Sequence, residues 1–118
     1  GMYSFDFYDA LNGFAIGGDY TKPKNQHSNK IRSHDGGKTW ELVAQDQSPS
    51  YRSCVQYVPN SNGLGLVAVG FEGVDYSQDA AETWKHLSDE GFYTLRFLND
   101  SVAFAAGKEK ISKLMFKE

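Results

Sequence analysis

Carboxylates are the most numerous side chains in this sequence that could act as acids, bases or nucleophiles. The chain carries 15 Asp and Glu residues in 118 positions. A glycosidase needs two carboxylates that face each other across the bond it cuts. The spacing selects no such pair among the scattered candidates, which include Asp6, Asp19, Glu72, Asp89 and Glu90. The carboxylates alone therefore do not identify a catalytic centre.

The histidines and the single cysteine give no sign of a metal site. His27, His34 and His86 lack the spacing that zinc sites use, and Cys54 has no second cysteine to join it. The glycine-rich run 63–70 faintly resembles a dinucleotide loop, but its spacing is wrong and no helix is expected after it. We expect no metal and no cofactor.

Two of the aspartates belong to a pattern that occurs twice. The stretches 33–40 (box 1) and 77–84 (box 2) share Ser-x-Asp-x-small-x-Thr-Trp, and Asp35 and Asp79 are 44 residues apart. In such a turn a short Asp side chain accepts hydrogen bonds from backbone N–H groups, and glycine permits a positive φ. A repeat of this length indicates stacked units such as propeller blades. We expect the turns, rather than a reaction, to use these carboxylates.

Both boxes resemble the Asp-box, or BNR repeat, of sialidase-like β-propellers. Similar boxes occur in propellers of the photosystem II assembly factor type and in bacterial proteins labelled as oxidoreductases. The matching residues are Ser33, Asp35, Gly37, Thr39 and Trp40 in box 1, and Ser77, Asp79, Thr83 and Trp84 in box 2. Box 2 has Ala81 where glycine is expected, and a left-handed alanine costs roughly 1–2 kcal/mol, which predicts a looser hairpin. In the family the box is a structural turn, so the resemblance implies a fold and not an activity.

Strand and turn signals divide the chain into repeating units. Short apolar or alternating runs between turn residues predict four strands in about 3–44, four in about 51–88 and three in about 92–117. One repeat position holds a glycine in every unit: Gly17, Gly70 and Gly107. The predicted fold is an all-β, partial β-propeller, with about two four-stranded blades plus three strands of a third.

Composition and charge exclude several classes of partner. With 14% aromatic residues, 12 glycines and 3 prolines, the chain is typical of a globular all-β protein. The net charge of −3, with acids and bases interspersed, provides no basic surface for nucleic acid. No stretch approaches the ~20 apolar residues of a membrane-spanning helix, so membrane insertion is not expected. The sequence does not determine the cellular compartment, although the resemblance implies an extracytoplasmic parent protein.

The candidate ligand-binding residues are aromatic and arginine side chains, most of them near the starts of the predicted innermost strands: Tyr20, Tyr51, Arg52, Tyr93 and Arg96. Sialidase-like catalysis uses an arginine cluster beside a Tyr/Glu pair, so it requires Arg52 and Arg96 to converge. Our leading hypothesis is a non-catalytic BNR/Asp-box module that binds a protein or glycan partner on its loop-bearing face. The alternative is a fragment of a sialidase-like glycoside hydrolase whose remaining catalytic residues lie upstream.

An incomplete propeller should leave apolar sheet faces uncovered. Gly1 before Met2 resembles the remnant of a removed tag, and the third unit has no box. We therefore expect the C-terminal part of a larger propeller. Such a piece exposes two sheet faces and a strand edge. This predicts a homo-oligomer in which copies associate through the exposed blade faces.

Overall fold

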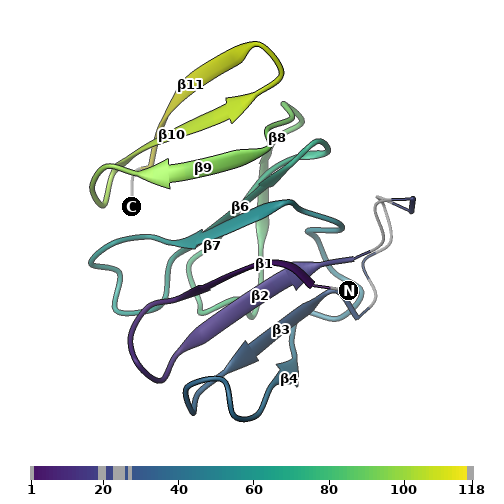
Figure 1. Ribbon diagram of the computed structural model, residues 1–118, viewed down its shortest axis with the longest axis vertical. Helices are drawn as coiled ribbons and strands as arrows, with labels where there is room; N and C mark the ends of the chain where they lie inside the picture. Colours follow the sequence, from purple (N-terminus) through teal and green to yellow (C-terminus); the bar gives the residue numbers. More distant parts are fainter. Residues whose placement is uncertain (1, 19–20, 23–25, 27, 117–118) are drawn as a thin grey trace.

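Three antiparallel sheets account for all regular structure in the part of the chain that our computed structural model describes, residues 2–18, 21–22, 26 and 28–116 (Figure 1). Blade 1 comprises β1 (Met2–Phe7), β2 (Gly13–Gly17), β3 (Lys30–Ser33) and β4 (Glu41–Leu42). Blade 2 comprises β5 (Cys54–Tyr57), β6 (Leu66–Gly70), β7 (Gly73–Ser77) and β8 (Lys85–Ser88). Blade 3 comprises β9 (Thr94–Phe97), β10 (Val102–Gly107) and β11 (Lys110–Met115). The predicted all-β, partial propeller is confirmed.

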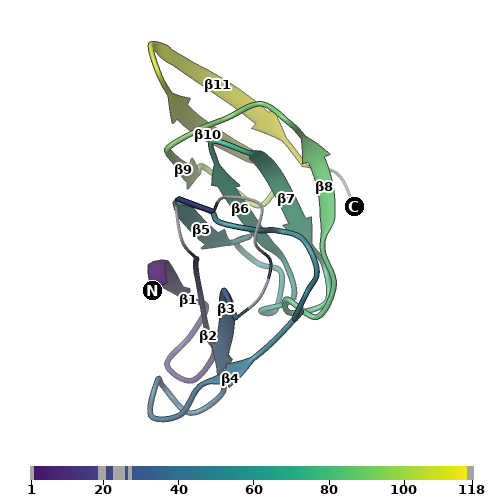
Figure 2. The ribbon, with the colours of Figure 1, turned by 90° about the vertical axis from the view of Figure 1, so that its right-hand side faces the viewer.

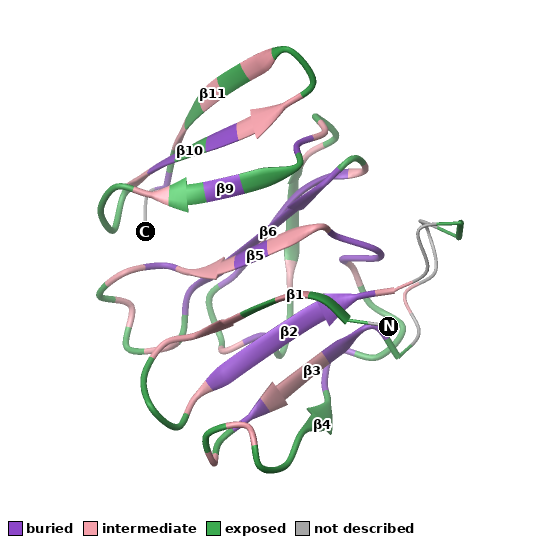
Figure 3. Cartoon of the chain, viewed as in Figure 1, coloured by how far each residue is buried: buried purple, intermediate pink, exposed green. Residues whose placement is uncertain are grey.

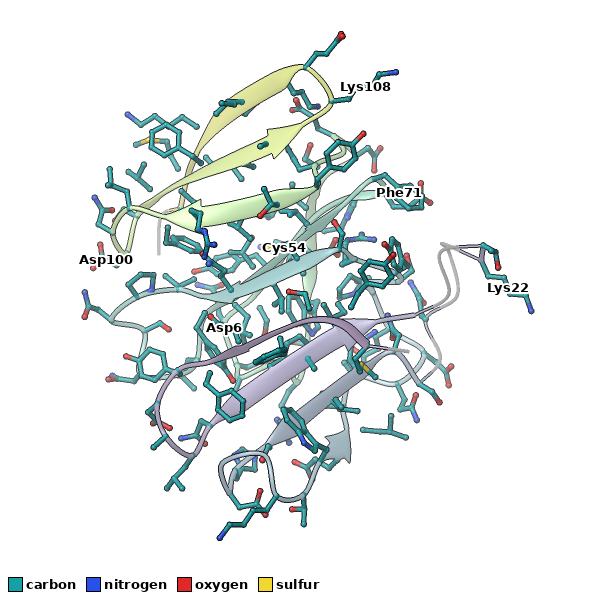
Figure 4. All side chains as sticks on the ribbon, viewed as in Figure 1. Asp6, Lys22, Cys54, Phe71, Asp100 and Lys108 are labelled. Carbon is teal, nitrogen blue, oxygen red and sulfur yellow. The ribbon has the colours of Figure 1, made fainter. Side chains whose placement is uncertain are left out.

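Each blade is a meander in which the strands pair in sequence order. The first strands of the three blades lie side by side, because β5 contacts both β1 and β9, and β4 and β11 lie at the two ends of the molecule (Figure 1). Figure 2 shows β1, β5 and β9 along one side of the molecule. The loops after the even-numbered strands of blades 1 and 2 emerge on one side, the loop-bearing face, where Lys22 and Phe71 lie (Figure 4). Asp100 lies at the opposite end (Figure 4). Within the described residues no helix exists that could cross a membrane.

Strand pairing places the three blades in one register. In each blade, one row of three paired residues crosses the first three strands. These rows are Asp6, Phe14 and Arg32 in blade 1; Gln56, Val67 and Tyr76 in blade 2; and Arg96, Phe104 and Lys113 in blade 3. We call each of them a seam row. The register matters because a side chain in one blade can be compared with its equivalents in the other two.

Two apolar cores fill the seams between neighbouring blades. The seam between blades 1 and 2 contains Phe14, Ile16, Val43, Ala44, Val55, Leu66, Ala68 and Ala81. The seam between blades 2 and 3 contains Val58, Val67, Val69, Val74, Phe92, Leu95, Ala103, Ala105 and Phe116. Strand β6 is buried over its whole length because blade 2 lies between the other two blades (Figure 3). Strand β11 instead alternates between exposed and half-buried positions, since one of its faces has no neighbour.

Blade 3 has apolar residues where the other two blades begin a box. By strand register, Leu114 takes the place of the box serine, and Phe116 falls where the box aspartate would stand. The ring of Phe116 is 8% exposed and lies 5.5 Å from the rings of Tyr76 and Phe97. An apolar plug therefore closes the seam between blades 2 and 3 at this end.

Candidate functional site

Both boxes are held by the same set of side-chain hydrogen bonds. In box 1, Ser33 Oγ donates to Asp35 at 2.8 Å and accepts from the N–H of Gly37 at 2.9 Å. Asp35 accepts from the N–H of Thr39 at 2.9 Å and from its hydroxyl at 2.6 Å. The equivalent bonds recur in box 2. The hydroxyl and N–H of Thr39, together with Ser33, lower the pKa of Asp35 to about 2, so this carboxylate is charged and engaged inside its turn.

Box 2 keeps this geometry without glycine. Ala80 and Ala81 have φ values of 58° and 76°, so the left-handed backbone anticipated from the sequence is present. The bonds to Ser77 and Thr83 have nearly the lengths of those in box 1, although the N–H of Asp79 lies 3.5 Å from Ser77 Oγ where that of Asp35 lies 3.3 Å from Ser33 Oγ, and the looser hairpin stays a prediction. Ala81 is 1% exposed, and the Trp84 ring lies 5.5 Å from the ring of Phe14 in blade 1. Packing against blade 1 offsets the backbone strain.

Arg32 ties box 2 to blade 1. Its Nη1 donates to the carbonyl oxygen of Ala80 at 3.1 Å, and its Nη2 forms an ion pair with Glu82. Its Nε donates to Glu41 at 2.8 Å, within blade 1. Each of the three guanidinium nitrogens of Arg32 therefore has a partner in the seam between blades 1 and 2.

Arg52 is buried and does not reach the predicted ligand face. Its side chain is 3% exposed, and its Nε and Nη2 donate to Asp75 Oδ1 at 3.2 and 2.6 Å. Its Nη1 donates to the carbonyl oxygen of Tyr51 at 2.7 Å. The sequence showed the arginine but not its partner, because Asp75 follows it by 23 positions and comes from another strand. Arg52 thus supports the loop-bearing face from below.

His86 extends this buried pair toward the surface. Its Nδ1 lies 3.1 Å from Asp75 Oδ1, and its Nε2 lies 2.7 Å from Asp89. The hydrogen bond to Asp89 is the main reason that the pKa of His86 is raised, and the bond to Asp75 adds to it. The side chain of His86 is 38% exposed, and its two ring nitrogens join β7 to the residues that follow β8.

Lys30 is a second buried cation in the same seam, and no sequence pattern pointed to it. Its side chain is 1% exposed, and Nζ donates to Asn29 Oδ1 at 2.8 Å and to the carbonyl oxygens of Gln47 and Pro49 at 2.8 and 2.7 Å. Burial, together with the nearby charge of Arg52, lowers the pKa of Lys30 to about 8. These bonds hold the linker between blades 1 and 2 in place.

Arg96 lies apart from the other two arginines. It is exposed on β9, in the seam row of blade 3, where it pairs with Phe104 on the face that no blade covers. Arg52 instead donates to Asp75, in the seam between blades 1 and 2. The arginine cluster that sialidase-like catalysis requires is therefore not formed by these side chains.

An aromatic surface, which we call the aromatic ledge, is the most distinctive feature of the loop-bearing face. It consists of Tyr3, Tyr51, Phe71 and Tyr93. The Tyr51 ring is buried and lies 5.2 Å from the Tyr3 ring and 5.4 Å from the Phe71 ring. Tyr3, Phe71 and Tyr93 are 57%, 47% and 59% exposed. Tyr20, also predicted for this face, lies outside the described residues.

Loop contacts position the ledge. Tyr93 is fixed by Ser53 Oγ, which donates to its carbonyl oxygen at 2.9 Å. Gly91 lies so close to the Phe71 backbone that a Cβ there would come within 2.8 Å of the Phe71 carbonyl oxygen. Only Tyr51 and Tyr93 of the ledge were singled out from the sequence. Tyr3 and Phe71 were missed because they join the others only through folding of separate blades.

Comparison with known proteins relates the chain to propellers through structure only. No family model matches the chain, and no curated protein sequence does. One similar solved structure is described as "YCF48 bound to D1 peptide", with a TM-score of 0.70 and 16% identity over 95% of this chain and 36% of that chain. Another is an ancestral GH74 enzyme, with a TM-score of 0.65 and 16% identity over 88% of this chain and 16% of that chain. The chain therefore spans only a part of either neighbour's length, and the likeness shows that it has the fold of a fragment of a β-propeller.

Proposed function

We propose that this chain is a non-catalytic propeller module that binds an extended protein segment on its aromatic ledge. The observation that carries the proposal is the packing of two exposed rings, Tyr3 and Phe71, on the buried Tyr51 ring. The exposed Tyr93 is tied to the same loops through its backbone, by Ser53. Rigid aromatic rings offer large contact area at a low entropy cost, and they dominate the energetics of many binding surfaces. The phenol hydroxyls of Tyr3 and Tyr93 add polar contacts for the backbone of a bound segment.

The polar groups below the ledge support a binding role over a catalytic one. Asp75 is fully buried and forms a salt bridge with Arg52, which also donates to the carbonyl oxygen of the ledge residue Tyr51. Asp89 is bonded to His86, and Glu90 forms an ion pair with Lys110. Among the described residues no group of three or more His, Cys, Asp or Glu side chains could hold a metal ion. The neighbour described as bound to a D1 peptide is consistent with a protein partner.

Selection from a peptide library tests this proposal, because it does not require an identified ligand. A phage library of random dodecapeptides would be selected on the wild-type chain, and binding of the enriched peptides would be measured by fluorescence anisotropy. We expect Phe71→Ala and Tyr93→Ala each to weaken binding roughly tenfold or more, as for aromatic hot spots. Leu98→Ala is the matched control, because Leu98 is 70% exposed and lies outside the ledge, at the turn between β9 and β10. Peptides that bind the ledge variants as tightly as wild type would contradict the proposal.

Glycan binding and glycoside hydrolysis are the competing functions, and the GH74 neighbour is the observation that favours the second. A printed glycan array, with the same ledge variants, would identify a glycan ligand if the peptide selection fails. Release of nitrophenol from aryl glycosides, including a sialoside, would reveal hydrolysis. Since Arg52 is paired with Asp75 and Arg96 lies on the uncovered face of blade 3, we expect no release above the rate given by Arg52→Gln.

A further inference from the structure

The outer face of blade 3 is an apolar sheet surface with cations on it, and no blade covers it. Its apolar side chains Phe104, Ile111 and Met115 are 42%, 77% and 61% exposed. Arg96 and Lys113, the two ends of the seam row of blade 3, flank Phe104. Both cations are exposed, and this seam row contains no acidic residue. The arrangement of cations and apolar side chains on this face can therefore be compared with that in the seam between blades 1 and 2, where a second blade is already packed.

The seam between blades 1 and 2 shows which groups of a neighbouring blade pair with a cation on such a face. At its outer end, Arg32 binds Glu82 and the carbonyl oxygen of Ala80, both from box 2. Arg32 and Lys113 occupy the same position of the seam row. A cation at this position is therefore matched by a carboxylate on the incoming blade, at the place of Glu82.

At its inner end, each closed seam uses a side-chain acceptor. Asp6 accepts from the N–H of Tyr57 at 2.8 Å, and Gln56, its equivalent in blade 2, accepts from the N–H of Phe97 at 3.1 Å. Arg96 stands at this position in blade 3 and has only donors. An incoming strand with a free N–H here would be left unpaired, whereas a carboxylate or carbonyl oxygen would be bound.

Blade 1 carries the other uncovered face, and a second copy of this chain could present it to blade 3. That face is also apolar, with Phe5 and Leu42 69% and 50% exposed. Its charge does not suit Lys113, however, because box 1 has the cation Lys38 at the position where box 2 has the carboxylate Glu82. In a seam of the same geometry Lys38 would meet Lys113, and like charges there are unfavourable.

The inner strand of blade 1 is no better match for Arg96. The N–H that corresponds to those of Tyr57 and Phe97 belongs to Phe7, and it already donates to Asp6 Oδ1 at 3.0 Å. The group that blade 1 presents at this position is therefore a donor, which Arg96 cannot accept from. The two free faces of the chain fit each other in hydrophobicity but not in charge.

We infer that the outer face of blade 3 binds an acidic, apolar sheet face, with one carboxylate opposite Lys113 and an acceptor opposite Arg96, and that it discriminates against a second copy of this chain. This surface is separate from the aromatic ledge, so the inference goes beyond the proposed function. Hydrophobic contact supplies the attraction, and the charges select the partner.

A charge cycle on the chain itself tests this inference, with Lys38→Glu as the probe that presents an acidic, apolar blade face. Sedimentation velocity over a concentration series would be recorded for wild type, Lys38→Glu, Lys113→Glu and the double variant. We expect both single variants to associate roughly tenfold or more tightly than wild type, because each creates an opposite pair. The double variant, with two acids at the contact, should return to the weak association of wild type. Lys22→Glu, the same charge change on an exposed loop residue, should have no effect.

Two outcomes would overturn the inference. If wild type associates as tightly as Lys38→Glu, a second copy is the natural occupant, and the homo-oligomer expected from the sequence gains support instead. If all four proteins stay equally monomeric, the face does not select an acidic partner. Raising the salt concentration should weaken association of the single variants, since exposed charges are screened within about 10 Å at 0.1 M. Circular dichroism would verify that every variant is folded.

Discussion

Box 1 and box 2 have the same turn chemistry in different surroundings. The serine, aspartate and threonine bonds agree in both, and in both the tryptophan Nε1 donates to a backbone carbonyl at 3.1 Å. Trp40 is 38% exposed, because box 1 lies on the uncovered face of blade 1, where its ring packs edge-on against Phe7. Trp84 is packed on Phe14 in a closed seam. The local pattern thus specifies the turn, while the neighbouring blade decides how much the turn contributes to stability.

The largest expected difference between the boxes comes from removing the two tryptophans. Trp84→Ala should lower the free energy of unfolding by about 3 kcal/mol, since it opens a cavity in the seam. Trp40→Ala should cost only about 1 kcal/mol, because solvent already reaches the ring. Urea denaturation followed by circular dichroism gives both values. Equal losses would mean that the seam contributes nothing to box 2 beyond the turn itself.

A smaller effect is expected from exchanging glycine and alanine between the boxes. Gly37 has a φ of 89°, and an added Cβ would meet Phe7 and Trp40 at 3.4 and 3.6 Å, which is ordinary contact. Gly37→Ala should therefore cost about 1 kcal/mol, from backbone strain alone. Ala81→Gly, at the equivalent position of box 2 with a φ of 76°, should change the stability by less than about 0.5 kcal/mol, because the relief of backbone strain is offset by the entropy of the more flexible unfolded chain and by the loss of a buried methyl group.

Thermal unfolding of both exchange variants, with Ala10→Gly as a control on an exposed turn residue, would measure this difference. A stabilising Gly37→Ala would show that box 1 does not need its left-handed residue. The difference in stability between the two boxes would then come from side-chain packing alone.

Local chemistry explains which features could be predicted from the sequence. The boxes, the strand order and the incomplete third blade follow from turn residues and alternation, which act over a few positions. The role of Arg52 was missed because its partner Asp75 comes from another strand, 23 residues away. Lys30 could not be recognised, since its acceptors are carbonyl oxygens that only the folded linker supplies. The ledge likewise depends on contacts between blades, which no periodicity in one strand encodes.

Acid titration should show the smallest difference between the boxes, because it probes the bonds they share. Hydrogen bonds from Thr39 lower the pKa of Asp35 to about 2. In box 2, burial tends to raise the pKa of Asp79, but the bonds from Thr83 outweigh it and the net shift is downward. A carboxyl group whose pKa is depressed in the folded state stabilises the protein above the unfolded pKa near 4, and this contribution is lost as the pH falls toward the folded pKa.

The stability difference between wild type and Asp35→Asn should therefore be constant from pH 7 to about 5 and shrink between about pH 4 and 2, and the difference for Asp79→Asn should likewise shrink as the pH falls below about 4. Urea denaturation at each pH would measure both differences, and the two curves should fall in the same direction. A curve for Asp79→Asn that stays flat down to pH 2 would show that box 2 depends on its seam and not on its carboxylate. The two boxes would then differ in their internal bonding as well as in their surroundings.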